Sequence, residues 1–220
     1  MIINQLSLSL FDFHSSDLKG KPEIIKLASE KNLHDGELII YKNLFDSVQS
    51  DSLFDQLFNN IAWRQDKIKM FGKQIDLPRL TAWYGDKNKS YKYSGITMNP
   101  DTWTPTLLTI KEKVETEAGL NFNSVLVNLY RNGQDYVSWH SDDEPELGNN
   151  PTIASVSFGA TRRFVLRHKS DKDLAKVEVA LTHGSLIIMQ GTMQHFWQHQ
   201  VPKTAKKISP RINLTFRSIT

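Results

Sequence analysis

The sequence predicts an α+β protein of mainly β structure, a double-stranded β-helix (jelly roll) with helices packed on its outer face. Two helical patterns lie in the first half of the chain, and short β-rich runs follow one another from Asn121 to the end. Several short strands after two helices are typical of two antiparallel sheets packed face to face. The chain has 220 residues, which is enough for one domain with a substantial core.

The first helix is predicted from apolar residues at helical spacing near position 57, after a strand at residues 36–41. Ser52 and Asp55 are placed for a capping box at its N-terminus. Its expected packing residues are Leu53, Phe54, Leu57, Phe58 and Ile61. We expect this helix to act as scaffold.

The second helix has clear start and stop signals. Thr104 can cap it, Pro105 suits the first helical position, and Gly119 ends it. Its expected buried stripe is Leu107, Leu108, Ile110 and Val114. We expect it to cover one face of a sheet.

After Asn121 the sequence predicts strands bounded by turn residues. Their expected ranges are 124–130, 136–140, 153–158, 163–168, 177–181, 185–189, 196–201 and 211–217. A roll of such strands has an open mouth. Its interior can hold a polar site where lining residues alternate with core residues.

The last strand alternates polar and apolar residues. Successive side chains of a strand point to opposite faces, so Arg211, Asn213 and Arg217 share one face, with Thr215. Ile212, Leu214 and Phe216 share the other face. Two cations on one sheet face need an anion, and this predicts a carboxylate-bearing cosubstrate. Asn128 and Tyr130 also share a face and could join the same pocket.

A second pattern predicts a metal site. His140 and Asp142 lie two residues apart at the end of a strand and point the same way, with a later histidine at position 195 or 199. The chain has no cysteine, so a metal must bind His, Asp or Glu. Two imidazoles, one carboxylate and open coordination positions describe a non-haem Fe(II) oxygenase site. Zinc also accepts this set, which leaves a zinc hydrolase open.

The charge distribution favours a nucleic-acid partner. The net charge is only +3, with a pI near 8.9. Basic residues gather in clusters at Lys67, Lys69 and Lys73, at Lys87, Lys89 and Lys92, at Arg162, Arg163, Arg167 and Lys169, and at Lys203, Lys206 and Lys207. Aromatic residues lie among them, namely Trp63, Phe71, Trp83, Tyr84, Tyr91 and Tyr93. Each cluster alone is typical of a solvated surface, but cations interleaved with rings suit phosphates and stacked bases.

No apolar run approaches the ~20 residues that cross a bilayer, so we expect no membrane association. The N-terminus lacks a basic flank and a cleavage pattern, so we expect an intracellular protein. A cytoplasmic location is expected in a prokaryote, and a nuclear one is open in a eukaryote. A monomer is expected.

Around these residues, the chain resembles the AlkB-like Fe(II)/2-oxoglutarate dioxygenases, which repair alkylated nucleic acids. The resemblance covers roughly residues 77–218. It is carried by the runs at residues 78–85 (PRLTAWYG), 128–132 (NLYRN), 139–144 (WHSDDE), 154–160 (ASVSFGA) and 210–217 (PRINLTFR). The family pattern has its second histidine before a residue pair and proline, which here is His199 before Pro202.

The resemblance implies Fe(II) bound by His140, Asp142 and His199. The 2-oxoglutarate would be held by Asn128, Tyr130, Arg211, Asn213 and Arg217. The implied activity is oxidative demethylation of bases such as 1-methyladenine and 3-methylcytosine, with release of succinate, CO2 and formaldehyde. The chain would be a single dioxygenase domain. Residues 1–76 would form an extension with a helix and a nucleic-acid-contacting loop, and residues 77–220 the jelly-roll core.

The same resemblance suggests substrate-binding residues, namely Phe71, Arg79, Tyr91, Tyr93, Asp143 and Glu144. Acidic Asp143 and Glu144 could accept from exocyclic amino groups, although an acidic solvated turn would have the same composition. The runs at residues 128–132, 141–148 and 197–203 look like the branch that favours single-stranded DNA and RNA. Phe71, between Met70 and Gly72, looks like the finger of the branch that works on duplexes, or is an ordinary apolar turn residue. A nucleic-acid-binding module with a vestigial metal site is a further alternative.

Overall fold

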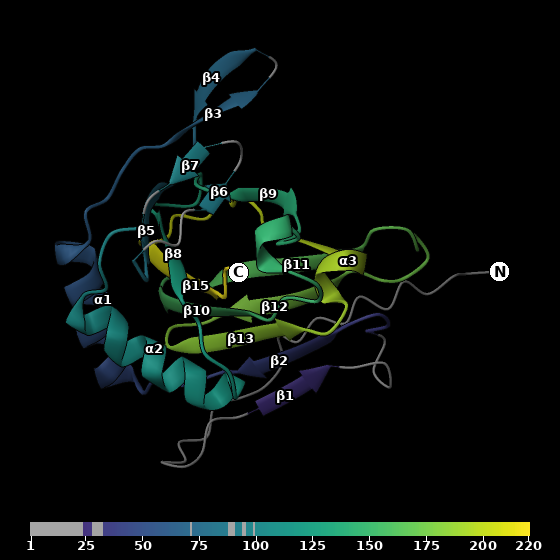
Figure 1. Ribbon diagram of the computed structural model, residues 1–220, viewed down its shortest axis with the longest axis horizontal. Helices are drawn as coiled ribbons and strands as arrows, with labels where there is room; N and C mark the ends of the chain where they lie inside the picture. The colour runs from purple at the N-terminus through teal and green to yellow at the C-terminus, as the bar shows by residue number, and fades with distance from the viewer. Residues whose placement is uncertain (1–23, 28–32, 71, 88–90, 94–95, 99) are drawn as a thin grey trace.

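Two antiparallel sheets packed face to face form the body of the protein, and two helices lie side by side against the larger sheet (Figure 1). The computed structural model describes residues 24–27, 33–70, 72–87, 91–93, 96–98 and 100–220. The helices are α1 (Ser47–Asn60) and α2 (Pro105–Ala118). This arrangement confirms the predicted jelly roll with helices on its outer face.

The larger sheet has seven strands. In spatial order they are β1 (Ile24–Leu27), β2 (Glu37–Tyr41), β13 (Ser185–Gln190), β10 (Ile153–Gly159), β15 (Arg211–Arg217), β8 (Ser124–Tyr130) and β5 (Leu80–Gly85). Every neighbouring pair is antiparallel. Strand β15 therefore lies inside the sheet, with ladders to β10 and β8 on its two sides.

The smaller sheet has four strands. In spatial order they are β12 (Val177–Leu181), β11 (Arg162–His168), β14 (Trp197–Val201) and β9 (Val137–His140). A short helix α3 (Met193–Phe196) leads into β14, and a 3-10 turn η2 (Pro145–Leu147) follows β9. Two hairpins complete the described fold: β3 (Lys67–Met70) with β4 (Lys73–Asp76), and β6 (Tyr91–Tyr93) with β7 (Ile96–Met98).

The alternation of β15 decides which residues reach the site. Ile212, Leu214 and Phe216 are fully buried in the core between the larger sheet and the helices. The polar residues of β15 face the other way, into a cavity between the two sheets, and they are Arg211, Asn213, Thr215 and Arg217. Burial of large apolar side chains on the helix face stabilises the sheet by roughly 1.5–3 kcal/mol each, and it fixes which side chains the cavity receives.

The structure confirms the predicted start and end of the second helix. Leu107 N donates to the Thr104 hydroxyl at 3.3 Å, Pro105 opens the helix, and Gly119 ends it in the left-handed region with φ 68°. The assignment of Leu108 to the buried stripe was wrong, because its side chain is 48% exposed. The stripe is narrower and consists of Leu107, Ile110 and Val114.

The predicted start of the first helix was wrong. The helix begins at Ser47, and its capping box uses Asp46 and Gln49 instead of Ser52 and Asp55. Gln49 N donates to Asp46 Oδ1 at 2.8 Å, and Asp46 N donates to Gln49 Oε1 at 3.3 Å. Glutamine can fill the third helical position of a capping box, so two such patterns competed in the sequence.

Every predicted strand exists with bounds within one residue of the expected range. The prediction missed β1, β5 and the two hairpins. Strand β5 contains Trp83 and Tyr84 and pairs with β8 along its whole length. The buried run of β5 has no polar–apolar alternation, so it gives little periodic signal.

No helix within the described residues is long and apolar enough to cross a membrane.

Replacing Asp46 with alanine tests the cap of α1. We expect Asp46→Ala to lower the free energy of unfolding by about 1 kcal/mol, because the Gln49 amide loses its acceptor. The matched control is Asp55→Ala, an exposed position inside the same helix, with an expected change within about 0.5 kcal/mol. Urea denaturation of the three proteins measures both. Equal losses in the two variants would contradict this cap assignment.

Candidate metal centre

Two histidines meet because two strands pair. Strand β14 runs antiparallel to β9, and His199 lies directly opposite His140 in this ladder. Buried and half-buried residues alternate along β14, so Trp197, His199 and Val201 face inward. The two imidazole ring centroids are 4.2 Å apart. Residues 59 positions apart in the chain are thus placed side by side by backbone register alone.

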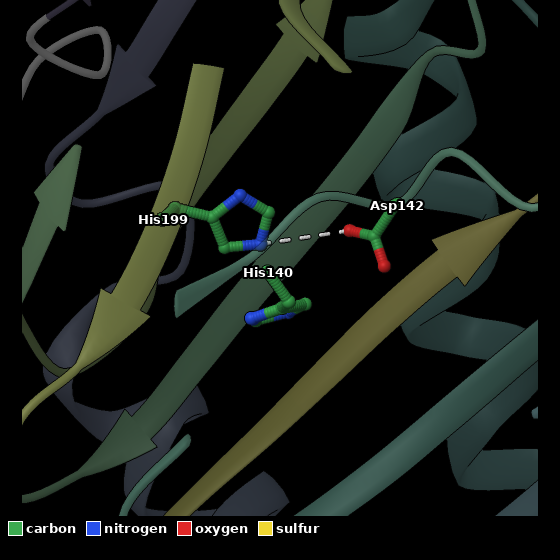
Figure 2. Close-up of side chains that lie close together, drawn as sticks. All are labelled: His140, Asp142 and His199. Carbon is green, nitrogen blue, oxygen red and sulfur yellow. Dashed lines mark ion pairs between the residues drawn. The ribbon is translucent and has the colours of Figure 1, made fainter. Parts of the chain in front are cut away.

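An aspartate completes the group just beyond the end of β9. Asp142 is 1% exposed, and its Oδ2 lies 3.7 Å from His199 Nε2 (Figure 2). One ligand atom from each of His140, Asp142 and His199 lies within 4.8 Å of the others. Across the described part of the chain, this is the one group of three potential ligands with that spacing. His195, the alternative third histidine, is exposed on α3 and lies outside the group.

The hydrogen-bond partner of His140 indicates which of its ring nitrogens donates. Its Nδ1 lies 2.8 Å from the backbone carbonyl of Ser138, which can only accept a hydrogen bond. Nδ1 therefore carries a proton, and Nε2 is the ring nitrogen available to a metal. This arrangement is typical of metal-binding histidines, whose other nitrogen donates to a carbonyl or carboxylate.

The other two potential ligands are held in the forms that a metal would require. Burial raises the pKa of Asp142, but Arg217, His199 and His140 outweigh burial and hold it below its ordinary value. Arg217 Nη2 donates to Asp142 Oδ1 at 2.5 Å. Burial and the neighbouring His140 lower the pKa of His199 to about 3. The site thus presents an ionised carboxylate and neutral imidazole at neutral pH, as metal binding demands.

A cavity between the sheets joins this group to the polar face of β15. Besides the three potential ligands, its lining includes Asn128, Tyr130, Arg211, Asn213 and Arg217. These are the five residues that the resemblance assigned to the cosubstrate, and the structure brings them together. Asn128 and Tyr130 come from β8, which pairs with β15 so that Asn128 faces Asn213 and Tyr130 faces Arg211.

Arg211 is the strongest indication of an anionic ligand. Its side chain is fully buried, with Nη2 donating to Ser157 Oγ at 2.8 Å and the Tyr130 ring 5.1 Å from its guanidinium carbon. Its Nε and Nη1 form no well-directed hydrogen bond with a described residue, although the Tyr130 side chain lies close enough to raise the pKa of Arg211. Burial lowers the pKa of Arg211 to about 10, so the group stays charged at neutral pH. A buried cation with unused donors is costly unless a ligand supplies the acceptors.

These observations fit 2-oxoglutarate, the cosubstrate that the resemblance implies. The planar fork of an arginine matches a carboxylate through two parallel hydrogen bonds. A dicarboxylic acid could therefore place its distal carboxylate on Arg211 while its other end reaches the His140, Asp142 and His199 group. Two imidazoles and one carboxylate with open positions suit Fe(II).

Two polar residues near the site, Ser155 and Gln194, were missed in the sequence. Asn213 Nδ2 donates to Ser155 Oγ at 2.7 Å and to the Val156 carbonyl at 3.0 Å, and Thr215 donates to Asn213 Oδ1 at 3.1 Å. Ser155 alternates with core residues of β10, and this period could have placed it in the cavity. Gln194, which contacts Asp142 from α3, had no such pattern.

The expected substrate residues have mixed placements. Arg79 is buried and lines the same cavity, where its Nε donates to Asn128 Oδ1 at 2.8 Å. Asp143 forms an ion pair with Lys169 at 3.0 Å, and Glu144 precedes η2. Tyr91 and Tyr93 belong to β6, but their side chains lie outside what the structure describes, and Phe71 lies outside the described residues altogether.

Some members of the basic and aromatic clusters cannot contact a partner. Arg162 is 3% exposed, and its Nη2 donates to the carbonyls of Asp135 and Pro202. Trp83 and Tyr84 are also buried. Their expected place on a nucleic-acid surface was wrong, because composition does not distinguish core residues from surface residues.

Comparison with known proteins identifies the family. Residues 37–217 match the model of the 2OG-Fe(II) oxygenase superfamily. The alpha-ketoglutarate-dependent dioxygenase alkB homolog 3 of Bos taurus is 47% identical over 182 residues, which is 79% of this chain and 63% of that protein. The DNA oxidative demethylase ALKBH2 of Homo sapiens is 39% identical over 188 residues, covering 81% and 72%. The chain therefore belongs to the 2OG-Fe(II) oxygenase superfamily and, within it, to the AlkB-like dioxygenases.

The chain spans slightly less than two thirds of the alkB homolog 3 relatives, which share 42–47% identity with it. Among solved structures, OsALKBH1 matches with a TM-score of 0.57 and 18% identity, over 84% of this chain and 98% of that one. This likeness concerns the fold alone.

Removing His199 tests the metal centre. We expect His199→Ala to weaken Co(II) binding by at least about 100-fold, because one of three protein ligands is lost. The matched control is His195→Ala, four residues away and exposed, with affinity unchanged. Anaerobic calorimetric titration measures both. Equal affinities in the two variants would exclude His199 as a ligand.

Proposed function

We propose that this chain is an Fe(II)- and 2-oxoglutarate-dependent oxidative demethylase of N-alkylated bases, such as 1-methyladenine and 3-methylcytosine, in DNA. One observation carries the proposal: a potential iron-binding triad and a buried arginine with unused donors line the same cavity. The name of the ALKBH2 relatives, DNA oxidative demethylase, supports the choice of substrate. We also propose alkylated bases in RNA as substrates.

In this proposal His140, Asp142 and His199 hold the iron. With 2-oxoglutarate and O2, bound iron would supply the chemistry that hydroxylates an N-methyl group. One oxygen atom of O2 would enter the methyl group and the other would enter succinate, with loss of CO2, and the hydroxymethyl product would then release formaldehyde. Arg217 keeps the Asp142 carboxylate ionised and oriented through the bond to its Oδ1. The other Asp142 oxygen, Oδ2, is the one near His199 and is directed toward the metal position.

The cosubstrate is assigned to Arg211, Asn213, Asn128, Tyr130 and Arg217. Arg211 would receive the distal carboxylate, and the Asn213 amide is held in place by Ser155 and Thr215. Arg79 orients Asn128 through its Oδ1. Because these groups are fixed by neighbours before any ligand arrives, little reorganisation is needed on binding.

The nucleic acid is proposed to approach from the side of the two hairpins. The β3–β4 hairpin projects from the body (Figure 1), with exposed Lys67 and Lys73 available for phosphates. Arg79, Tyr91, Tyr93, Asp143 and Glu144 are proposed to bind the damaged base, and Phe71 to fill the gap it leaves in a duplex. A nucleic-acid substrate places the proposed action inside the cell, and we propose a monomer that favours single strands.

Replacing Arg211 distinguishes the proposed enzyme from a protein that only binds nucleic acid. We expect Arg211→Ala to lower 2-oxoglutarate-dependent turnover at least about 100-fold, since a charge-assisted bidentate contact is lost. Oligonucleotide affinity should stay within about twofold, because Arg211 is buried away from the surface. The control Lys111→Ala removes a cation paired with Glu115 on the outer helix α2 and should leave turnover unchanged. Loss of DNA binding with retained turnover would contradict the assignment.

Strand preference is tested with paired substrates. Oligonucleotides carrying one 3-methylcytosine, single-stranded or in a duplex, are assayed with the wild-type chain and Phe71→Ala. If Phe71 fills the gap left by a flipped base, the variant loses activity on the duplex several-fold and keeps it on the single strand. Equal losses on both substrates would rule out a finger specific to duplexes.

A further inference from the structure

The loop that carries Asp142 needs support that its strand does not give. Strand β9 ends at His140, so Asp142 lies beyond the backbone ladder that fixes the two histidines. A metal site requires its ligand atoms to be held within a fraction of an ångström. Arg217 holds the carboxylate oxygen Oδ1 at the end of the Asp142 side chain, but the backbone of the loop needs a support of its own.

Hydrogen bonds from the loop to the segment before His199 provide this support. Ser141 Oγ donates to the Trp197 carbonyl at 2.8 Å, and Asp142 N donates to Gln194 Oε1 at 2.9 Å. Both acceptors lie in α3 and the first residue of β14, the strand that carries His199. The loop with one ligand is thus fastened to the segment that leads to another.

Lys169 provides a third connection between the loop and α3. Its Nζ lies 3.0 Å from Asp143 Oδ2 and donates to the Gln194 carbonyl at 2.9 Å, while its backbone N donates to the Phe196 carbonyl at 2.7 Å. Lys169 follows strand β11 directly, so the anchor for α3 belongs to the smaller sheet. Ser141, Asp142 and Asp143 are thus connected to residues 194–197, either directly or through Lys169.

Gln194 is the centre of this arrangement. Its side chain is fully buried, and its Nε2 lies 3.6 Å from Met189 Sδ. A buried amide is costly unless its hydrogen bonds are used, and an apolar residue of similar length would fill the same space. The backbone N–H of a ligand residue needs an acceptor, so the bond from Asp142 also fixes which way the amide points.

We propose that Gln194 is a positioning residue of the metal centre, which sets the Asp142 carboxylate at its working distance from His199. This inference rests on the proposed iron site. Gln194 contacts neither metal nor cosubstrate in this role. It acts by holding the loop backbone, and the loss of such supporting contacts typically costs 10–100-fold in metal affinity.

Three variants of Gln194 test the proposal. Gln194→Met keeps length and removes the acceptor, Gln194→Asn withdraws the amide by one methylene, and Gln194→Glu keeps an acceptor oxygen at the same reach. We expect Co(II) affinity to fall on the order of 10-fold in the first two and to stay within about threefold in the third. The matched control is Gln198→Met, which lies on β14 and contacts Arg167 on the opposite face.

The readouts separate positioning from folding. Anaerobic calorimetry gives the Co(II) affinity, the visible absorbance of the Fe(II)–2-oxoglutarate complex reports the geometry at the metal, and circular dichroism confirms the fold. A shifted absorbance band in a folded Gln194→Asn chain supports the proposal even if Gln194→Met does not fold. Wild-type affinity and an unchanged band in Gln194→Asn would overturn it. A wild-type chain that binds neither Co(II) nor Fe(II) would instead overturn the proposed function.

Discussion

The pairing of β14 with β9 is the constraint on which the site depends. It sets His199 opposite His140, and a shift of β14 by one residue would put His199 on the opposite face of the sheet from His140. The ladder is irregular between His199 and Val201, and the buried side chains of Trp197 and Val201 lie on the same face as His199. Strand pairing and apolar packing therefore place the two histidines, and the loop with Asp142 is fastened to the same strand segment.

The second determinant is the balance of buried charge. Asp142 and Arg217 are both almost fully buried and form an ion pair, which lowers the cost of keeping the carboxylate ionised. Arg211 has no carboxylate beside it among the described residues and keeps unused donors. One buried arginine is thus matched by a protein anion, and the other is suited to a ligand anion. Because an unmatched buried cation is destabilising by itself, the pocket is better explained by binding than by stability.

Much of this site could be predicted from the sequence because strands have a period of two residues. The alternation from Arg211 to Arg217 indicated a polar face and an apolar face, and the structure has both. The spacing of His140 and Asp142 indicated a metal site, but only the family pattern distinguished His199 from His195. Gln194 and the cap at Asp46 were missed, since a single buried amide has no period and two capping patterns lay a few residues apart. Arg162 and Trp83 were misplaced on the surface because burial is decided by strand pairing far away in the sequence.

The most direct test of the account is the stoichiometry of products. The wild-type chain is incubated with Fe(II), 2-oxoglutarate, O2 and a limiting amount of an oligonucleotide that carries one 3-methylcytosine. We expect formaldehyde in equal amount to the repaired base, and substrate-dependent succinate in equal amount to both. Repair that proceeds with zinc and without 2-oxoglutarate, or an intact methyl group after full incubation, would contradict the account.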